Sequence, residues 1–89
     1  MAVLKVSVIS PERVLYEGEA GSVVAPAYDG EVGILSGHAP MMTLLGRGEL
    51  RLGAGAAARR FSVAGGFLQV VDDQVRVVTE QASELTAAR

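Results

Sequence analysis

His38 is the only histidine in the chain, and it stands in "GEVGILSGHAPMMTLL", residues 30–45. A lone histidine can serve as a catalytic base, a metal ligand or a contact on a covered surface. A hydrolase would use Ser36 or Ser62 as nucleophile and Asp29 as the acid that orients His38. Ser36 is only two residues from His38, however, and the sequence contains no G-x-S-x-G nucleophile elbow. We therefore expect no catalytic residue.

The residue types and their spacing also argue against a metal site and a nucleotide site. One histidine and no cysteine make a zinc site improbable, because most such sites need three or four protein ligands. Residues 53–58, "GAGAAA", fit G-x-G-x-x-A, and Asp73 lies 20 residues beyond Gly53, where a ribose acceptor would be sought. That fingerprint needs a helix after the glycines, whereas "RRFSVAGGF" indicates another strand. We expect a hairpin tip there, and neither a cofactor nor a metal.

The composition of the chain excludes several further classes of function. The chain has 89 residues, enough for one compact domain, and its net charge is −2. No basic cluster exists beyond Arg59-Arg60, which argues against nucleic acid as a partner. The absence of cysteine excludes disulfides, and no apolar run approaches the roughly 18–20 residues that span a bilayer. We expect a soluble intracellular domain without membrane insertion.

Apolar residues alternate with polar ones in the segments that must position these side chains. Leu4, Val6 and Val8 share one face of "LKVSV", and "ELRL", "RFSV" and "VRV" repeat the pattern. Turn signals such as Ser10-Pro11 and Asp72-Asp73 separate the runs. Short strands at this spacing predict an all-β sandwich or barrel.

Paired apolar residues interrupt the alternation at five places. Because neighbouring side chains of a strand point to opposite faces, each pair should bury one residue and present the other outward. A bulge or a strand end is the alternative for any single pair. Five pairs together favour an outer face that a partner covers; they are Val23-Val24, Met41-Met42, Leu44-Leu45, Val70-Val71 and Val77-Val78.

The last residues change character. From Glu80 the sequence is rich in helix formers, but about ten residues cannot hold a helix alone in water. We expect a β-sandwich domain over residues 1–80 and a short tail of helical character over residues 81–89.

Two loops stand out by their backbone chemistry. Gly37 can adopt a positive φ and Pro40 favours an extended Ala39, so "SGHAP" should be a rigid loop that presents His38 to a partner. A loop histidine without a role is the alternative. In "YDGEVG" a tight turn displays Asp29 and Glu31, which would suit a basic partner surface but also an ordinary solvated turn.

The stretches "ISPERVLYEGEAGSVVAPAYDGEVGILSGHAPMMTLL", "GRGELRL" and "FSVAGGFLQVVDDQVRVVTE" closely resemble the epsilon subunit of bacterial and chloroplast F-type ATP synthases. The resemblance runs almost from end to end. It implies a flattened β-sandwich of roughly ten short strands at the foot of the central stalk. It also implies a non-catalytic rotor subunit that links the gamma subunit to the c-ring and couples ion-driven rotation to ATP synthesis. Such a subunit is peripheral on the cytoplasmic face of the bacterial plasma membrane, or on the stromal side of the thylakoid.

The resemblance also implies the contact residues. The gamma interface would comprise Ser10, His38, Met41, Met42 and Thr43. The polar loops of the c-ring would meet Asp29, Gly30, Glu31 and Val32.

One part of the family pattern is missing. Most members continue into a C-terminal helical hairpin that can restrain ATP hydrolysis and in some members binds ATP, whereas this sequence stops at Arg89. We expect a naturally short form that neither binds ATP nor strongly inhibits hydrolysis. The alternative function is a general β-sandwich module that binds proteins or sugars, although a sugar platform would have only four aromatic residues to draw on.

Overall fold

The computed structural model describes residues 3–53 and 58–85, and these residues form eight strands and no helix. The expected all-β class is confirmed. The strands are β1 (Leu4–Ile9), β2 (Val14–Ala20), β3 (Ser22–Ala27), β4 (Gly30–Leu35), β5 (Met41–Leu44), β6 (Arg47–Leu52), β7 (Arg59–Val71) and β8 (Gln74–Leu85).

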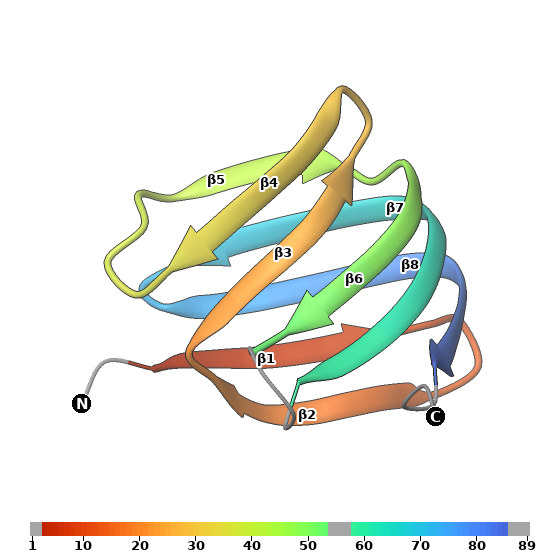
Figure 1. The fold of residues 1–89 in the computed structure, drawn as a ribbon, viewed down its shortest axis with the longest axis horizontal. Coiled ribbons are helices and arrows are strands. Elements are labelled where there is room, and N and C mark those ends of the chain that lie inside the picture. The colour runs from red at the N-terminus through yellow and green to blue at the C-terminus, as the bar shows by residue number, and fades with distance from the viewer. Residues whose placement is uncertain (1–2, 54–57, 86–89) are drawn as a thin grey trace.

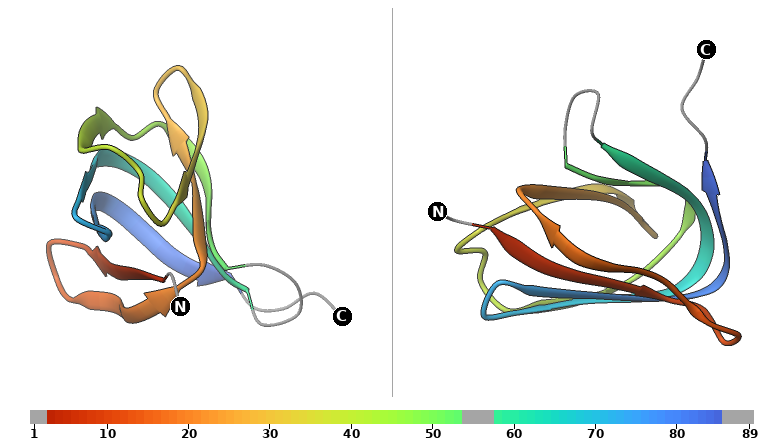
Figure 2. Two further views of the ribbon diagram at one scale, coloured as in Figure 1. Left: turned by 90° about the vertical axis from the view of Figure 1, so that its left-hand side faces the viewer. Right: turned by 90° about the horizontal axis from the view of Figure 1, so that it is seen from below.

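One bent sheet supplies both layers of the fold (Figure 1). Strands follow the order β2-β1-β8-β7-β6-β3-β4, and β5 pairs with β7 beside this path. The first half of β7 pairs with β6 and the second half with β5, so β7 belongs to two layers. β8 pairs with both halves of β7 and therefore also belongs to both layers. We call them the β1 layer (β2, β1 and β5 with the adjoining halves of β7 and β8) and the β3 layer (β4, β3 and β6 with the other halves). Figure 2 shows β7 and β8 curving from one layer to the other.

Two glycines make this bend possible. Gly65 and Gly66 have φ values of 77° and 103°, in the region that favours glycine. A Cβ atom on Gly66 would lie 1.9 Å from the carbonyl oxygen of Val78, so no side chain fits there. The pair therefore bends β7 instead of ending it. The eight strands, with β7 and β8 serving both layers, provide the ten strand segments that the resemblance implied.

The helical character expected for the tail is wrong for residues 81–85. β8 continues through Leu85 because Gln81 to Leu85 pair with Ala64 to Arg60 of β7. Ladder hydrogen bonds to a neighbouring strand outweigh a weak helix preference. Strand β8 thus crosses the boundary expected at residue 80, and residues 86–89 lie outside the described part of the chain.

The core lies between the two layers. Burial follows the alternation read from the sequence: Leu4, Val6 and Val8 are buried, and Lys5 between them is exposed. Removing one such side chain from water stabilises the fold by roughly 1.5–3 kcal/mol. The buried apolar residues are Leu4, Val6, Val8, Val23, Ala25, Ile34, Leu45, Leu50, Leu52, Phe61, Val63, Leu68, Val70, Val75 and Val77.

Candidate protein–protein interface

Each apolar pair divides between the core and the outer surface, as its spacing predicted. Leu45 is 5% exposed, whereas Leu44 before it is 63% exposed. Val70 is fully buried and Val71 is 40% exposed. Met42 is 63% exposed, while Met41 packs against the core. The other two pairs bury Val23 and Val77 and leave Val24 and Val78 half-buried.

Two of these outward members, Leu44 and Val78, lie in one row across the β1 layer. Pairing joins Leu44 to Phe67, Phe67 to Val78, Val78 to Ile9, and Ile9 to Val14. Directly opposed side chains in a sheet lie about 5 Å apart, so these residues form one apolar row, in which the pair Ile9 and Val14 follows a register shift after Val8. We call it the outer stripe: Leu44, Phe67, Val78, Ile9 and Val14.

The outer stripe has the character of a binding surface. Its two end residues, Leu44 and Val14, are 63% and 55% exposed, and its three central residues are half-buried. The next row on the same face is polar apart from Met42: it continues through Gln69, Arg76, Ser7 and Glu17. An apolar strip bordered by polar residues is typical of protein–protein interfaces. Sequence inspection found Leu44 and Val78 through their apolar pairs but missed Phe67, Ile9 and Val14.

The residues expected against gamma do not share one face. Met41 pairs with Val70 and Thr43 with Leu68, and both partners are fully buried, so Met41 and Thr43 face inward. Of the three β5 residues expected at this interface, Met42 alone faces outward, on the same side as Leu44.

Ser10 and His38 lie at opposite ends of the β1 layer. Ser10 follows Ile9, at the end that carries the outer stripe, and its hydroxyl donates to the carbonyl oxygen of Arg13 at 3.2 Å. The loop at residues 36–40, which contains His38, precedes β5 at the other end of the layer (Figure 1). A partner that contacts both residues must therefore run along the length of the strands.

The loop before β5 holds His38 in one orientation. Gly37 has a φ of 88°, and the His38 N–H donates to the carbonyl oxygen of Leu35 at 3.1 Å. His38 Nδ1 lies 2.7 Å from the carbonyl oxygen of Ala39. Because a carbonyl oxygen only accepts, Nδ1 is the donor in this contact.

Ser36 and His38 do not form a catalytic pair. The Ser36 hydroxyl donates to Asp73 Oδ2 at 2.8 Å, and the Gly37 N–H donates to Asp73 Oδ1 at 2.7 Å. These two bonds, the one from Gly37 first, hold the pKa of Asp73 below its usual value. Asp73, which a nucleotide site would have used for a ribose, instead fastens this loop.

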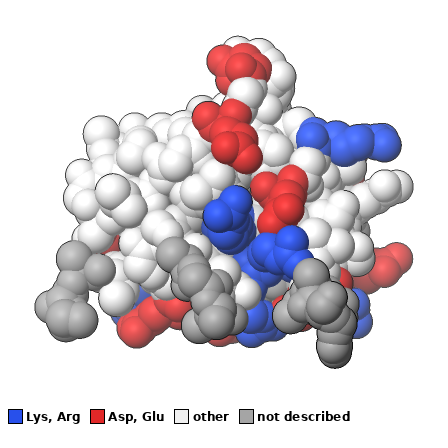
Figure 3. Space-filling model, viewed as in Figure 1, with Lys and Arg blue, Asp and Glu red and all other residues white. Residues whose placement is uncertain are grey.

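The acidic turn forms the exposed tip of the β3–β4 hairpin. Asp29, Gly30 and Glu31 are exposed, and Gly30 has a φ of 133°. Val32, which was expected beside them, is half-buried and packs against the core. Tyr28 before the turn is 69% exposed and was not anticipated as a contact residue. The hairpin projects from the body in Figure 1, and acidic side chains gather at its end in Figure 3.

Other chemistry lacks support in the described residues. β6 ends at Leu52, which pairs with Arg59 of β7, so the G-x-G-x-x-A segment joins two antiparallel strands and no helix follows it; residues 54–57 lie outside the described part. No three His, Asp or Glu side chains gather as metal ligands would in residues 3–53 and 58–85. The same ranges contain no helix that could cross a membrane.

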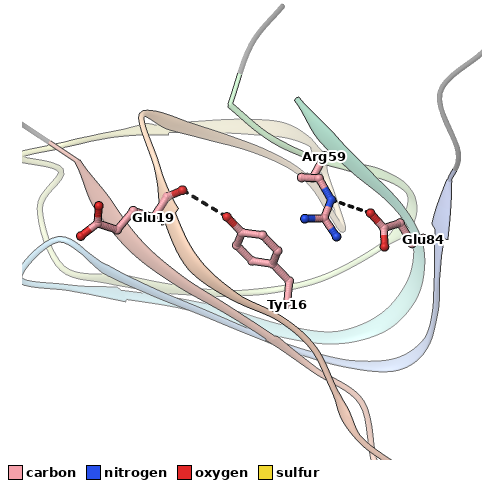
Figure 4. Close-up of polar contacts among 4 residues, drawn as sticks. All are labelled: Tyr16, Glu19, Arg59 and Glu84. Atoms are coloured by element: carbon pink, nitrogen blue, oxygen red, sulfur yellow. Dashed lines mark hydrogen bonds and ion pairs between the residues drawn. The ribbon is translucent and has the colours of Figure 1, made fainter. Parts of the chain in front are cut away.

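A cluster of polar side chains bridges the β1 layer and the β3 layer (Figure 4). Arg59 of β7 forms an ion pair with Glu84 of β8 and lies 5.1 Å from the ring centre of Tyr16 on β2. The hydrogen bond between Arg59 and Glu84 raises the pKa of Arg59 and lowers that of Glu84. The Tyr16 ring also packs edge-on against Phe61, 6.3 Å between centres. The Arg59 and Phe61 contacts of Tyr16 join the two layers.

Comparison with known proteins identifies close relatives. Residues 3–85 match the family model described as ATP synthase, Delta/Epsilon chain, beta-sandwich domain. The ATP synthase epsilon chain of Leptospira borgpetersenii is 45% identical over 80 residues, which cover 90% of this chain and 63% of that protein. The epsilon chain of Caulobacter vibrioides is 39% identical over 84 residues, covering 94% of this chain and 98% of that protein.

Solved structures share the fold. A chain in the cryo-EM structure of the Euglena gracilis mitochondrial ATP synthase, OSCP/F1/c-ring, superposes with a TM-score of 0.85 at 22% identity, covering 94% of this chain and 54% of that chain. A chain in the central stalk/c-ring structure of the Tetrahymena thermophila mitochondrial ATP synthase gives a TM-score of 0.74 at 15% identity, covering 90% and 65%.

Proposed function

The chain belongs to the ATP synthase delta/epsilon family, and we propose that it is a non-catalytic rotor subunit of an F-type ATP synthase. In this role it links the gamma subunit to the c-ring, and it couples ion-driven rotation to ATP synthesis that other chains carry out. The Leptospira relatives named epsilon chains support the role, and the solved structures with the same fold belong to ATP synthases. The chain spans 63% of the length of those Leptospira relatives.

The outer stripe is the surface we assign to gamma. It offers apolar area on the outer face of the β1 layer, and Met42 extends it along β5. Unbranched methionine adapts to an irregular partner surface. Ser10 at one end and His38 at the other would contact gamma at the margins of this face. Met41 and Thr43 support the same strand from inside.

The hairpin tip is the surface we assign to the c-ring. Asp29 and Glu31 are exposed, and Gly30 gives the turn its shape. Carboxylates on a projecting turn suit polar loops that carry hydrogen-bond donors or positive charge. Val32 holds the hairpin against the core and so supports the contact indirectly.

The observation that carries the proposal is the hydrogen bonding between the two surfaces. The Tyr28 N–H at the hairpin donates to the carbonyl oxygen of Leu44, at 3.1 Å. The Gly46 N–H donates to the carbonyl oxygen of Pro26 at 2.7 Å, and Leu45 donates to Gly66 at 2.9 Å. A rotor subunit must not shear between its two contacts. The first two bonds fasten the hairpin to Leu44 and to Gly46 two residues later, and the third fastens Leu45 to β7.

Such a subunit would be peripheral to the membrane, on the cytoplasmic face in a bacterium or the stromal side of the thylakoid in a chloroplast. The same geometry would serve either location, because both surfaces contact protein and neither contacts lipid.

The proposal is tested by mixing the purified chain with the gamma subunit of the same enzyme. Gel filtration should show one complex with one copy of each chain. An unrelated coiled-coil protein, used as the control, should elute separately. If the chain and gamma elute separately, the proposal fails, and a general binding module for peptides or sugars becomes the better reading.

A further inference from the structure

The turn between β7 and β8 lies directly against the loop that carries His38. Its second residue, Asp73, binds that loop with both carboxylate oxygens. Oδ2 accepts from the Ser36 hydroxyl at 2.8 Å and Oδ1 accepts from the Gly37 N–H at 2.7 Å. Hydrogen bonds to an ionised carboxylate are among the stronger ones in proteins. Asp73 is therefore a two-point fastening across 36 residues of sequence.

The backbone of the turn fixes where this carboxylate points. Asp72 and Asp73 have φ values of 51° and 62°, which aspartate and asparagine tolerate better than most residues. The carbonyl oxygen of Asp73 also accepts from the N–H of Lys5 at 2.9 Å, so the turn is bound to the start of β1. Asp73 thus joins the loop to β1 and to the turn that connects β7 with β8.

The segment that Asp73 fastens has few other restraints. β5 has four residues and pairs with β7 along one edge. Within residues 36–40, the backbone bond from His38 to Leu35 and the His38 ring contact with Ala39 join close sequence neighbours. Fixing the backbone of a loose residue costs conformational entropy, and binding would have to meet this cost if the loop were released.

We infer that Asp73 is a positioning residue for partner binding: its carboxylate fixes the loop at residues 36–40 and thereby presents His38 and the edge strand β5 in their binding geometry. The inference rests on the proposed function, because the partner is the gamma subunit. Asp73 itself lies in the turn between β7 and β8, immediately before β8, and acts through Ser36 and Gly37.

Three variants separate the carboxylate from the turn. Asp73→Gly removes both bonds and suits a positive φ. Asp73→Asn keeps an acceptor for Gly37, and its amide can donate to the Ser36 oxygen. Asp72→Gly is the matched control, since it makes the same change at the neighbouring positive-φ position of the same turn.

The experiment measures three quantities for each variant: the Kd for gamma by calorimetry, hydrogen exchange of the Gly37 amide, and Tm. We expect Asp73→Gly to weaken binding by about ten-fold or more, the equivalent of about 1.4 kcal/mol. Its Gly37 amide should exchange faster, while its Tm stays near that of Asp72→Gly. Asp73→Asn should bind within about three-fold of the wild type.

The outcomes separate the inference from the function beneath it. If wild-type chain binds gamma and Asp73→Gly binds equally well, the positioning role is wrong and the proposed function stands. Equal losses in Asp72→Gly and Asp73→Gly would also overturn the role, because the turn and not the carboxylate would then matter. If the wild type does not bind gamma, the proposed function and the inference fail together.

Discussion

The backbone N–H of Tyr28 donates a hydrogen bond to the carbonyl oxygen of Leu44, 3.1 Å away. Tyr28 adjoins the exposed acidic tip of the β3–β4 hairpin, and Leu44 is one of the two end residues of the outer stripe. One main-chain bond thus joins the two surfaces that we assign to different partners. Because close-packed cores and ladders deform little, motion of one surface should carry the other with it.

Replacing Leu44 by serine should weaken gamma binding without unfolding the chain. Leu44 is 63% exposed, so the fold loses little, whereas an interface would lose a buried anchor. We expect a loss of about 1–2 kcal/mol in binding free energy, measured by calorimetry.

Val71→Ser is the matched control for that change. Val71 is an outward apolar residue, 40% exposed, that lies outside the outer stripe. Its substitution should leave the Kd for gamma unchanged. Equal losses for Leu44→Ser and Val71→Ser would show that the stripe has no special part in binding.

Glu31→Lys should impair coupling at the c-ring while leaving gamma binding intact. The substitution reverses a charge at the exposed hairpin tip, where Glu31 pairs with Pro26 of β3, whereas the outer stripe lies in the β1 layer. We expect ATP-driven ion pumping in membranes to fall by about two-fold or more. Glu19→Lys, an exposed charge reversal on β2, should pump normally. Normal pumping by both variants would remove the ring contact from Glu31.

Gly66→Ala should strongly destabilise the fold. The new Cβ would lie 1.9 Å from the carbonyl oxygen of Val78, and Gly66 has a φ of 103°. We expect the free energy of unfolding to fall by about 3 kcal/mol or more in urea denaturation. Gly21→Ala meets no atom within 4 Å and should change stability little. If Gly66→Ala is as stable as Gly21→Ala, the bend at Gly65-Gly66 is not as tight as described.

Acid should release the His38 loop. Hydrogen bonds from Gly37 and Ser36 lower the pKa of Asp73 in the folded chain below the usual aspartate value of 3.8. A carboxyl group whose pKa is lower in the folded state stabilises the fold at pH values above its unfolded-state pKa. That stability is lost as the pH falls through the folded-state pKa. In an NMR titration the Gly37 amide shift should follow the Asp73 carboxyl, with a midpoint below 3.8. A midpoint at or above 3.8, or a Gly37 amide that does not respond, would contradict the bond.

Local patterns in the sequence predicted much of the fold. Alternation at Leu4, Val6 and Val8 marked the core face of β1, and the pair Leu44-Leu45 marked a strand exposed on one side. Both depend only on the two-residue period of a strand. The same period could not tell which residues of β5 face outward, because the pairing of Thr43 with Leu68 settles that.

Features that depend on distant pairing could not be predicted. Gly65-Gly66 has the composition of a turn, and only the close approach of Val78 shows it to be a bend within β7. Residues 81–85 favour a helix by composition, and pairing with β7 makes them a strand. Asp73 and Gly37 are 36 residues apart, and no local motif connects them.

Site-specific cross-linking in the assembled enzyme tests the rotor role most directly. The chain has no cysteine, so Leu44→Cys and Glu31→Cys each carry a single photoreactive label. We predict that the label at position 44 joins gamma and that the label at position 31 joins the c subunit in membranes. Labels that reach neither chain, or that both reach the same one, would contradict a rigid link between two rotor parts.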